Sequence, residues 1–224
     1  MAHVAVCLSG CGVQDGSEIH EAVLTLLALN QAGAEIVCCA PNANQPRVVN
    51  HLTGEPAGAE RRNILVESAR IARGQIQDLA TVRAADIDAL IFPGGFGAAT
   101  NLCTFADDGP DCSVLPEVER LIGDMLEAGK PIGAICIAPA LLARAMTKLG
   151  LHPTLTIGND AATAAALVKM GAQHVACEAT DCIIDEHHNI VTTPAYMLAS
   201  GPAEVYEGVR KLVDQILKRT VTAS

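Results

Sequence analysis

One cysteine stands where a strand is expected to turn into a helix, and this position favours nucleophilic chemistry. The apolar run 131–135 suits a buried strand, the Ala- and Leu-rich run from Pro139 suits a helix, and Cys136 is the polar side chain between them. Such a turn lifts one side chain above the edge of a sheet. There the helix dipole stabilises a thiolate, and unpaired backbone N–H groups can bind an oxyanion. Cys136 is therefore our candidate nucleophile; the alternative is a cysteine that only fills the core.

Backbone amides for such an oxyanion are expected at the end of a second strand. The run 89–92 predicts a strand, and Gly94 and Gly95 follow it closely. Glycine allows positive φ and a close backbone approach, so this turn and the amide of Ile137 are candidates for an oxyanion hole. Paired glycines also occur in ordinary turns. Their combination with the thiol favours the functional interpretation.

Carboxylates near the thiol could move protons. A glycine-rich turn (residues 9–16) follows the first expected strand, and a helix from Ser17 carries Glu18 and Glu21 in its first turns. Either carboxylate can simply cap the helix and interact with its dipole. A catalytic role requires one of them to lie over the sheet edge beside the cysteine. Further candidates for lining a substrate cleft are Cys11, His20 and Asn101.

Strands and helices alternate through most of the chain, which predicts a three-layer α/β sandwich with helices on both faces of a mostly parallel sheet. A hairpin is appended near the carboxyl end. Ligands of such sheets bind outside the carboxyl ends of the strands, so we expect the candidate residues to meet in one cleft. No linker or repeat interrupts the pattern, so residues 1–224 are expected to form a single domain. The expected strands cover 4–8, 35–40, 89–92, 131–135, 154–157, 174–176, 182–185 and 189–193, and the expected helices 17–32, 62–73, 116–128, 138–149, 160–170 and 202–218.

The first of these helices is expected to bury one face. Apolar residues at helical spacing predict that its buried face consists of Ile19, Val23, Leu26 and Leu27. Aromatic residues make up only 2% of the chain, so the core must be built from aliphatic side chains.

Composition excludes several classes of function. The formal charge is −10 and no run of Lys or Arg exceeds a pair such as Arg61-Arg62, so the chain lacks the basic patch that a nucleic acid requires. No apolar stretch approaches the ~20 residues that span a bilayer, and no signal-peptide pattern precedes the first strand, so we expect a cytoplasmic protein. The nine cysteines are odd in number and lack paired C-x2-C spacings, which favours reduced thiols and no metal site.

Several runs resemble a known family. The run 89–95, together with 134–139, resembles the paired strand ends of the DJ-1/PfpI superfamily, relatives of the class I glutamine amidotransferases. The runs 8–21, 50–55, 154–158 and 193–198 more closely resemble its ElbB branch, named for enhanced lycopene biosynthesis. The resemblance covers nearly the whole chain. It implies a flavodoxin-like fold, a homodimer and an association with isoprenoid biosynthesis.

The resemblance also implies a chemistry. In these relatives the elbow cysteine is the nucleophile, and a Glu five residues after a Gly touches it; Gly16 and Glu21 match this pattern, which favours Glu21 over Glu18. The implied activity is a glyoxalase that needs no cofactor and converts glyoxal, a small 2-oxoaldehyde, into glycolate. Related proteins are reported as deglycases.

The chain departs from related enzymes where a basic histidine would stand. PfpI-type proteases carry His directly after the nucleophile, where this chain has Ile137, and the glyoxalase relatives use a later His in a segment where residues 156–158 have none. Amidotransferases carry His-Pro-Glu where residues 193–196 read Thr-Pro-Ala-Tyr. The alternative to an enzyme is a redox sensor or stress-response binding protein, in which Cys136 oxidises and alters a partner surface. Catalytic consumption of glyoxal distinguishes the two.

Overall fold

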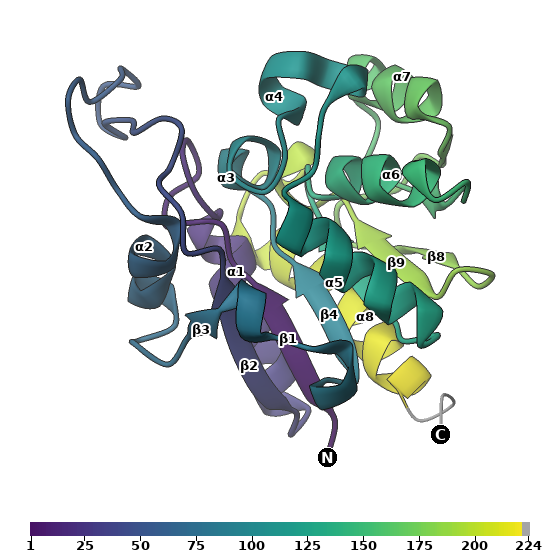
Figure 1. Cartoon of the computed structure of the whole chain (residues 1–224). Helices are drawn as coiled ribbons and strands as arrows, with labels where there is room; N and C mark the ends of the chain where they lie inside the picture. Colours follow the sequence, from purple (N-terminus) through teal and green to yellow (C-terminus); the bar gives the residue numbers. More distant parts are fainter. Residues whose placement is uncertain (221–224) are drawn as a thin grey trace.

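The computed structural model of the chain describes residues 1–220, and a seven-stranded sheet forms its centre (Figure 1). Its strands are β1 (His3–Cys7), β2 (Glu35–Ala40), β3 (Gln77–Asp78), β4 (Ala89–Phe92), β5 (Ile132–Ile135), β8 (Ile183–Asp185) and β9 (Ile190–Thr193). The strand order is β3-β2-β1-β4-β5-β9-β8, and all neighbours are parallel except β8 and β9, which form the predicted hairpin. The central strands are almost continuously apolar because both faces of the sheet are covered.

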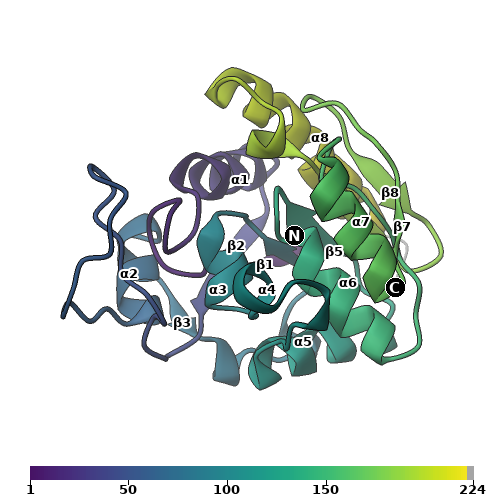
Figure 2. The same ribbon diagram turned by 90° about the horizontal axis from the view of Figure 1, so that it is seen from above.

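Helices cover both faces of this sheet. They are α1 (Ile19–Gln31), α2 (Ile64–Ile71), α3 (Phe96–Thr100), α4 (Phe105–Asp108), α5 (Pro116–Glu127), α6 (Pro139–Lys148), α7 (Ala161–Met170) and α8 (Pro202–Thr220), with 3-10 helices η1 (Leu79–Thr81), η2 (Ala84–Asp86), η3 (Gly109–Asp111) and η4 (Ala195–Met197). The helices α1, α2 and α8 pack on one face, whereas α3, α5, α6 and α7 lie on the other (Figures 1 and 2). This arrangement confirms the predicted flavodoxin-like three-layer sandwich.

Two of the expected strands do not join the main sheet. The segments 154–157 and 174–176 form only β6 (Thr154–Leu155) and β7 (Gln173–His174), which pair with each other as a separate two-stranded sheet. The carboxylate of Asp185 in β8 accepts a hydrogen bond from the backbone N–H of Thr154 at 2.7 Å. A side chain, rather than a ladder of backbone hydrogen bonds, therefore ties β6 to the edge of the main sheet.

The predicted buried face of α1 is wrong. Ile19, Val23 and Leu27 are 43%, 45% and 41% exposed. The helix is apolar around most of its circumference, so spacing alone did not identify the side that packs on α8 and the sheet. The residues that α1 buries are Glu21, Ala22, Thr25, Ala28 and Leu29.

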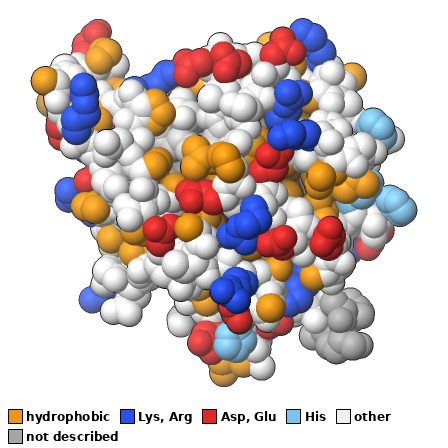
Figure 3. Space-filling model, in the orientation of Figure 1, with side chains coloured by type: hydrophobic (Ala, Val, Ile, Leu, Met, Phe, Trp, Pro, Cys, Tyr) orange, Lys and Arg blue, Asp and Glu red, His pale blue; other side chains and the backbone are white. Residues whose placement is uncertain are grey.

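The surface bears on the partners expected from composition. On the face shown in Figure 3, acidic and basic side chains are interspersed rather than gathered into one basic patch. Among residues 1–220, no helix combines the length and the apolar character needed to cross a membrane.

Candidate active site

The turn at Cys136 has the geometry of a nucleophile elbow. The strand β5 ends at Ile135, Cys136 has φ 62°, and α6 begins at Pro139. Positive φ is unfavourable for a residue with a Cβ atom and tends to occur where a site requires it. The N–H of Cys136 donates to the carbonyl oxygen of Thr193 in β9 at 2.9 Å, which anchors the turn to the neighbouring strand. The side chain of Cys136 is therefore held at the carboxyl edge of the sheet, where it is only 8% exposed.

The carboxyl group of Glu21 lies against this thiol. The helix α1 places Glu21, which is completely buried, over the sheet edge, and its carboxyl group is hydrogen-bonded to the thiol of Cys136. Its Oε2 accepts from the N–H of Gly94 at 2.9 Å and its Oε1 from the N–H of Tyr196 at 3.3 Å. Glu18 instead caps the helix by accepting from the N–H of Glu21 at 2.7 Å. Of the two candidate carboxylates, Glu21 is thus the one in contact with the cysteine.

Glycine at position 94 makes this contact possible. A Cβ atom there would lie 2.5 Å from the Cβ of Cys136 and 2.6 Å from Oε2 of Glu21. Because the amide of Gly94 donates to Glu21, it is not free to bind an oxyanion, which corrects its expected role. The amides of Gly95 and Ile137 do reach the sulfur of Cys136. Two of the three expected donors therefore face the reactive atom.

Burial raises the pKa values of both ionisable groups. The pKa of Glu21 rises to about 8, chiefly because the carboxyl group is desolvated and also because Glu18 repels its charge. The pKa of Cys136 lies well above the ordinary thiol value, first through burial and then through the adjacent carboxyl; the amides of Gly95 and Ile137 act in the opposite direction. The expected low-pKa thiolate is thus wrong for the resting site. The pair keeps its protons at neutral pH and shares one negative charge after the first proton is lost.

The thiol opens into an apolar cavity of about 390 Å³. Residues from the glycine-rich turn, the β4–α3 turn, α4, the elbow, α7 and the segment after β9 surround it. The segment 101–115 includes α4 and η3, and α4 supplies part of the lining. The lining residues are Val13, Glu18, Gly95, Phe96, Ala99, Phe105, Ala106, Cys136, Ile137, Thr163, Tyr196 and Met197. None of these described residues carries a positive charge.

Tyr196 is one of the residues of this site that the sequence did not single out. It follows β9, lines the cavity and donates its backbone N–H to Glu21. Its hydroxyl is hydrogen-bonded to Nδ1 of His20 at 2.7 Å, so His20 supports the cavity wall without being among the residues that line it. The preceding Ala195 has φ 44°, a second unfavourable backbone conformation at the site. In the sequence, Tyr196 follows the expected strand 189–193. That position indicates a place at the site only because β9 pairs with β5, the strand that ends at the elbow.

Asn101 and Cys11 lie outside the cavity, contrary to expectation. Asn101 is 1% exposed, and its Nδ2 donates to the carbonyl oxygens of Ser9 at 2.7 Å and Asp15 at 2.9 Å. It therefore holds the glycine-rich turn in place. Cys11 on that turn lies in a separate polar pocket. The other residues of this pocket are Glu60, Arg61, Arg62, Glu67 and Arg70.

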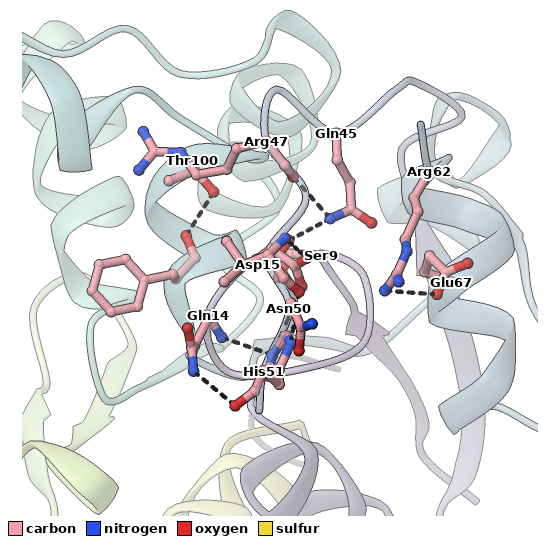
Figure 4. Close-up of polar contacts among 12 residues, drawn as sticks. Ser9, Gln14, Asp15, Gln45, Arg47, Asn50, His51, Arg62, Glu67 and Thr100 are labelled. Atoms are coloured by element: carbon pink, nitrogen blue, oxygen red, sulfur yellow. Dashed lines mark hydrogen bonds and ion pairs between the residues drawn. The ribbon is translucent and has the colours of Figure 1, made fainter. Parts of the chain in front are cut away.

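The segment 45–51 holds the same turn from outside (Figure 4). The buried carboxylate of Asp15 accepts a hydrogen bond from the backbone N–H of Val49 at 2.8 Å. The backbone carbonyl oxygen of Asp15 accepts one from the side-chain amide of Gln45 at 2.7 Å. The N–H of Gln14 donates to Nε2 of His51 at 3.1 Å. His51 thus contacts this loop rather than the thiol. These contacts explain how a glycine-rich turn keeps one conformation.

The described residues offer no preformed metal site. Across residues 1–220, no group of three or more His, Cys, Asp or Glu side chains could hold a metal ion. All nine cysteines are free.

Comparisons with known proteins agree with this fold. The model of the DJ-1/PfpI family matches residues 10–213. The human "glutamine amidotransferase-like class 1 domain-containing protein 3, mitochondrial" is 46% identical over 98% of this chain and 84% of its own length. The zebrafish (Danio rerio) "ES1 protein, mitochondrial" is 34% identical over 97% of this chain and 86% of its own length.

A solved structure is similar over almost the entire chain. The crystal structure of an isoprenoid biosynthesis protein with an amidotransferase-like domain, from Ehrlichia chaffeensis, has a TM-score of 0.90 and 38% identity and covers 96% of this chain and 99% of its own. The structure of Drosophila melanogaster DJ-1beta has a TM-score of 0.57 and 19% identity, covers 100% of this chain and 96% of its own, and supports the fold alone.

These relatives correct the expected location and establish the family. Both curated proteins are named mitochondrial, so the expectation of a cytoplasmic protein is wrong. That expectation rested on the lack of a secretory signal pattern, which argues against export but says nothing about import into an organelle. From the family match and the similarity to the Ehrlichia protein, the chain belongs to the DJ-1/PfpI family, in its ElbB-like branch.

Proposed function

We propose that the protein is a cofactor-independent glyoxalase that converts 2-oxoaldehydes into 2-hydroxy acids at Cys136. One observation carries the proposal: an elbow cysteine at positive φ is hydrogen-bonded to a buried carboxyl group and opens into a cavity. Nucleophile, proton carrier and oxyanion donors are the parts that covalent catalysis on a carbonyl requires. The names of the relatives support a mitochondrial location and a connection with isoprenoid biosynthesis.

The first half of the reaction forms a carbon–sulfur bond. Once the Cys136–Glu21 pair has lost one proton, the sulfur of Cys136 adds as a thiolate, beside the protonated carboxyl group of Glu21, to the aldehyde carbon of R–CO–CHO. The electron pair of the C=O bond moves onto oxygen. The amides of Gly95 and Ile137 stabilise this oxyanion, which then takes the proton of Glu21. The product is a hemithioacetal, R–CO–CH(OH)–S–Cys, beside an ionised carboxylate.

The second half redistributes hydrogen within this adduct. The carboxylate of Glu21 removes the proton from the carbon bound to sulfur and returns a proton to the neighbouring carbon, while the hydroxyl proton moves to the ketone oxygen. The adduct becomes a thioester, R–CH(OH)–CO–S–Cys. Water adds to this thioester, the carbon–sulfur bond breaks, and a 2-hydroxy acid leaves as the thiol is restored. The sum consumes one water and needs no external oxidant or reductant.

We assign Tyr196 a part in the hydrogen transfer. Tyr196 lines the cavity, and its hydroxyl is oriented by His20. Burial and the nearby Glu18 and Glu21 raise the pKa of this hydroxyl, so it keeps its proton and can donate a hydrogen bond to the ketone oxygen. The Tyr196–His20 pair would supply the polar contact that a histidine after the nucleophile supplies in the relatives.

The site favours this enzyme over a redox sensor. Sensor cysteines react with peroxide because they are exposed and have a low pKa. Cys136 is buried, and its pKa is raised. Both properties slow oxidation, whereas an enzyme can form the reactive anion when substrate binds.

The test is glycolate formation from glyoxal by the purified protein, with a metal chelator present throughout. We expect many turnovers per molecule in the wild type and in Cys11→Ala, a matched control outside the cavity. Turnover should be lost in Cys136→Ala and Glu21→Gln. A stoichiometric adduct without turnover, or an active Cys136→Ala variant, would disprove the glyoxalase proposal.

A further inference from the structure

We infer that the Cys136 site selects an uncharged electrophile with an apolar substituent, such as an aryl or branched alkyl 2-oxoaldehyde, over glyoxal itself. The inference refines the proposed function in its choice of substrate, but it rests on the shape and lining of the cavity. Glyoxal would use only the reacting end of the site.

The first observation is the size and position of the cavity. Its volume of about 390 Å³ falls within the ~300–1,000 Å³ of sites that enclose drug-sized ligands, far more than a two-carbon dialdehyde fills. The helices α3, α4 and α7 stand together above the carboxyl ends of the strands and supply part of its lining (Figures 1 and 2). A substituent on the aldehyde therefore has space next to the thiol.

The second observation is the apolar character of the walls. Two phenyl rings, Phe96 and Phe105, come from α3 and α4, and Met197 closes the side after β9. Phe96 remains 53% exposed, so an apolar group in the cavity would remove this ring from water. Removing apolar surface from water is favourable in proportion to the area covered. A hydrated, polar dialdehyde gains nothing from these walls.

The third observation is the charge around the thiol. Glu18 borders the cavity, the Cys136–Glu21 pair carries one negative charge in the form that reacts, and the described lining residues include no cation to pair with a bound carboxylate. A negatively charged substrate would be repelled, and burial would remove the water that screens this repulsion. The same repulsion favours release of the 2-hydroxy acid, which forms as an anion.

Turnover of matched substrates is the first arm of the test. We would compare kcat/KM for glyoxal, phenylglyoxal and 4-carboxyphenylglyoxal, the last of which differs from the second by one carboxylate. We expect at least a tenfold preference for phenylglyoxal over glyoxal, mainly through KM, and at least a tenfold loss on adding the carboxylate. In Ala106→Leu, which narrows the cavity, the ratio of phenylglyoxal to glyoxal should fall toward one. Ala80→Leu, a matched exposed alanine outside the cavity, should leave the ratio unchanged.

Alkylation of the thiol is the second arm and does not depend on turnover. Rates at Cys136 would be measured by peptide mass mapping with iodoacetate, iodoacetamide and N-phenyl iodoacetamide, each divided by its rate with glutathione. We expect the N-phenyl reagent to react at least fivefold faster than iodoacetamide, and iodoacetate most slowly. Cys11, whose pocket contains Arg61, Arg62 and Arg70, is an internal control that should not favour the phenyl group.

The two arms separate the two claims. Turnover of glyoxal without any preference in either arm would overturn the inference and leave the glyoxalase proposal standing. A clear alkylation preference without turnover of any aldehyde would support the inference and refute the glyoxalase. Equal alkylation by the neutral and charged reagents would overturn the inference whatever the turnover.

Discussion

At the scale of single residues, the site depends on two groups that burial keeps protonated. Burial raises the pKa values of both Glu21 and Cys136; the carboxyl group raises the pKa of the thiol further, whereas the hydrogen bond with the thiol lowers the pKa of Glu21. Burial outweighs that hydrogen bond, so both groups hold their protons in the resting protein at neutral pH. The pair becomes anionic only when one proton leaves. A buried carboxyl group with a raised pKa lowers the free energy of unfolding at higher pH, because the group ionises more readily in the unfolded chain than in the folded protein.

Stability should therefore fall with rising pH because of Glu21. Its pKa is about 8 in the folded protein against an ordinary 4.5, so its favourable contribution is complete below about pH 4.5 and is lost progressively up to about pH 8. Relative to Glu21→Gln, the wild type should lose on the order of several kcal/mol of unfolding free energy between pH 5 and pH 8.5. Urea denaturation at both pH values measures this difference. The exposed-site variant Glu55→Gln should parallel the wild type, and parallel curves for Glu21→Gln would contradict the raised pKa.

The hydroxyl of Tyr196 is expected to act in catalysis rather than in folding. Tyr196→Phe should lower kcat by about 10²-fold, a typical effect of losing a general acid, and should change thermal stability little. The matched control is Tyr206→Phe, whose hydroxyl is bonded to Gln31 on the surface. Steady-state kinetics and thermal melting of both variants measure the two effects. Equal kcat values for both variants would remove Tyr196 from the mechanism.

At the scale of elements, two turns bring the reacting groups together. The β5–α6 turn raises Cys136, and the β4–α3 turn brings backbone instead of a side chain against it. The contact between thiol and carboxyl exists because Gly94 has no Cβ. The amides of Gly95 and Ile137 that reach the sulfur come one from each turn. A change in either turn should thus affect the thiol and the carboxyl group together.

Gly94→Ala tests this dependence. The added methyl would meet both Cys136 and Glu21, so we expect loss of activity and a destabilisation of about 1–3 kcal/mol from overpacking. Gly123→Ala in α5 is the matched control, since a Cβ there meets nothing within 4 Å and should stabilise the helix by roughly 0.5–1 kcal/mol. Chemical denaturation measures the stability of both variants, and glyoxal turnover measures their activity. An active, undestabilised Gly94→Ala variant would show that the close approach is unnecessary.

At the scale of the whole molecule, the exposed stripe of α1 bears on assembly. Ile19, Val23 and Leu27 recur every four residues and therefore share one face, and all three are exposed. The chain carries a net charge of −10, which opposes association of two copies over most surfaces. A stripe without charge can meet its own copy across a two-fold axis without repulsion. The homodimer implied by the family resemblance stays a prediction, and we expect this stripe to form its contact.

Val23→Glu should convert the dimer into a monomer, because two buried carboxylates would face each other across the axis. Light scattering coupled to size exclusion measures the molar mass. The control Val66→Glu changes an equally apolar, 61% exposed residue on α2 and should leave the dimer intact. A monomeric wild type would disprove the homodimer, and a dimeric Val23→Glu variant would place its interface elsewhere.

The sequence by itself determined the features that depend on local patterns. The strands at 35–40 and 89–92, the hairpin after β8 and the elbow at Cys136 were predicted, since apolar runs, glycine turns and capping residues act over a few neighbours. Glu21 was preferred over Glu18 because of a motif rather than geometry. Each of these features lies within one contiguous stretch, and the conformation of that stretch depends mainly on its own residues.

Only the tertiary structure decided which surfaces meet. It selected the buried side of α1, placed Asn101 and Cys11 outside the cavity, and brought Tyr196 to Glu21 from a distant segment. It also determined the raised pKa values and the apolar cavity, because desolvation and enclosure depend on all the elements packed around a group. A residue's type limits its chemistry, but its neighbours across the fold decide which part of that chemistry it can perform.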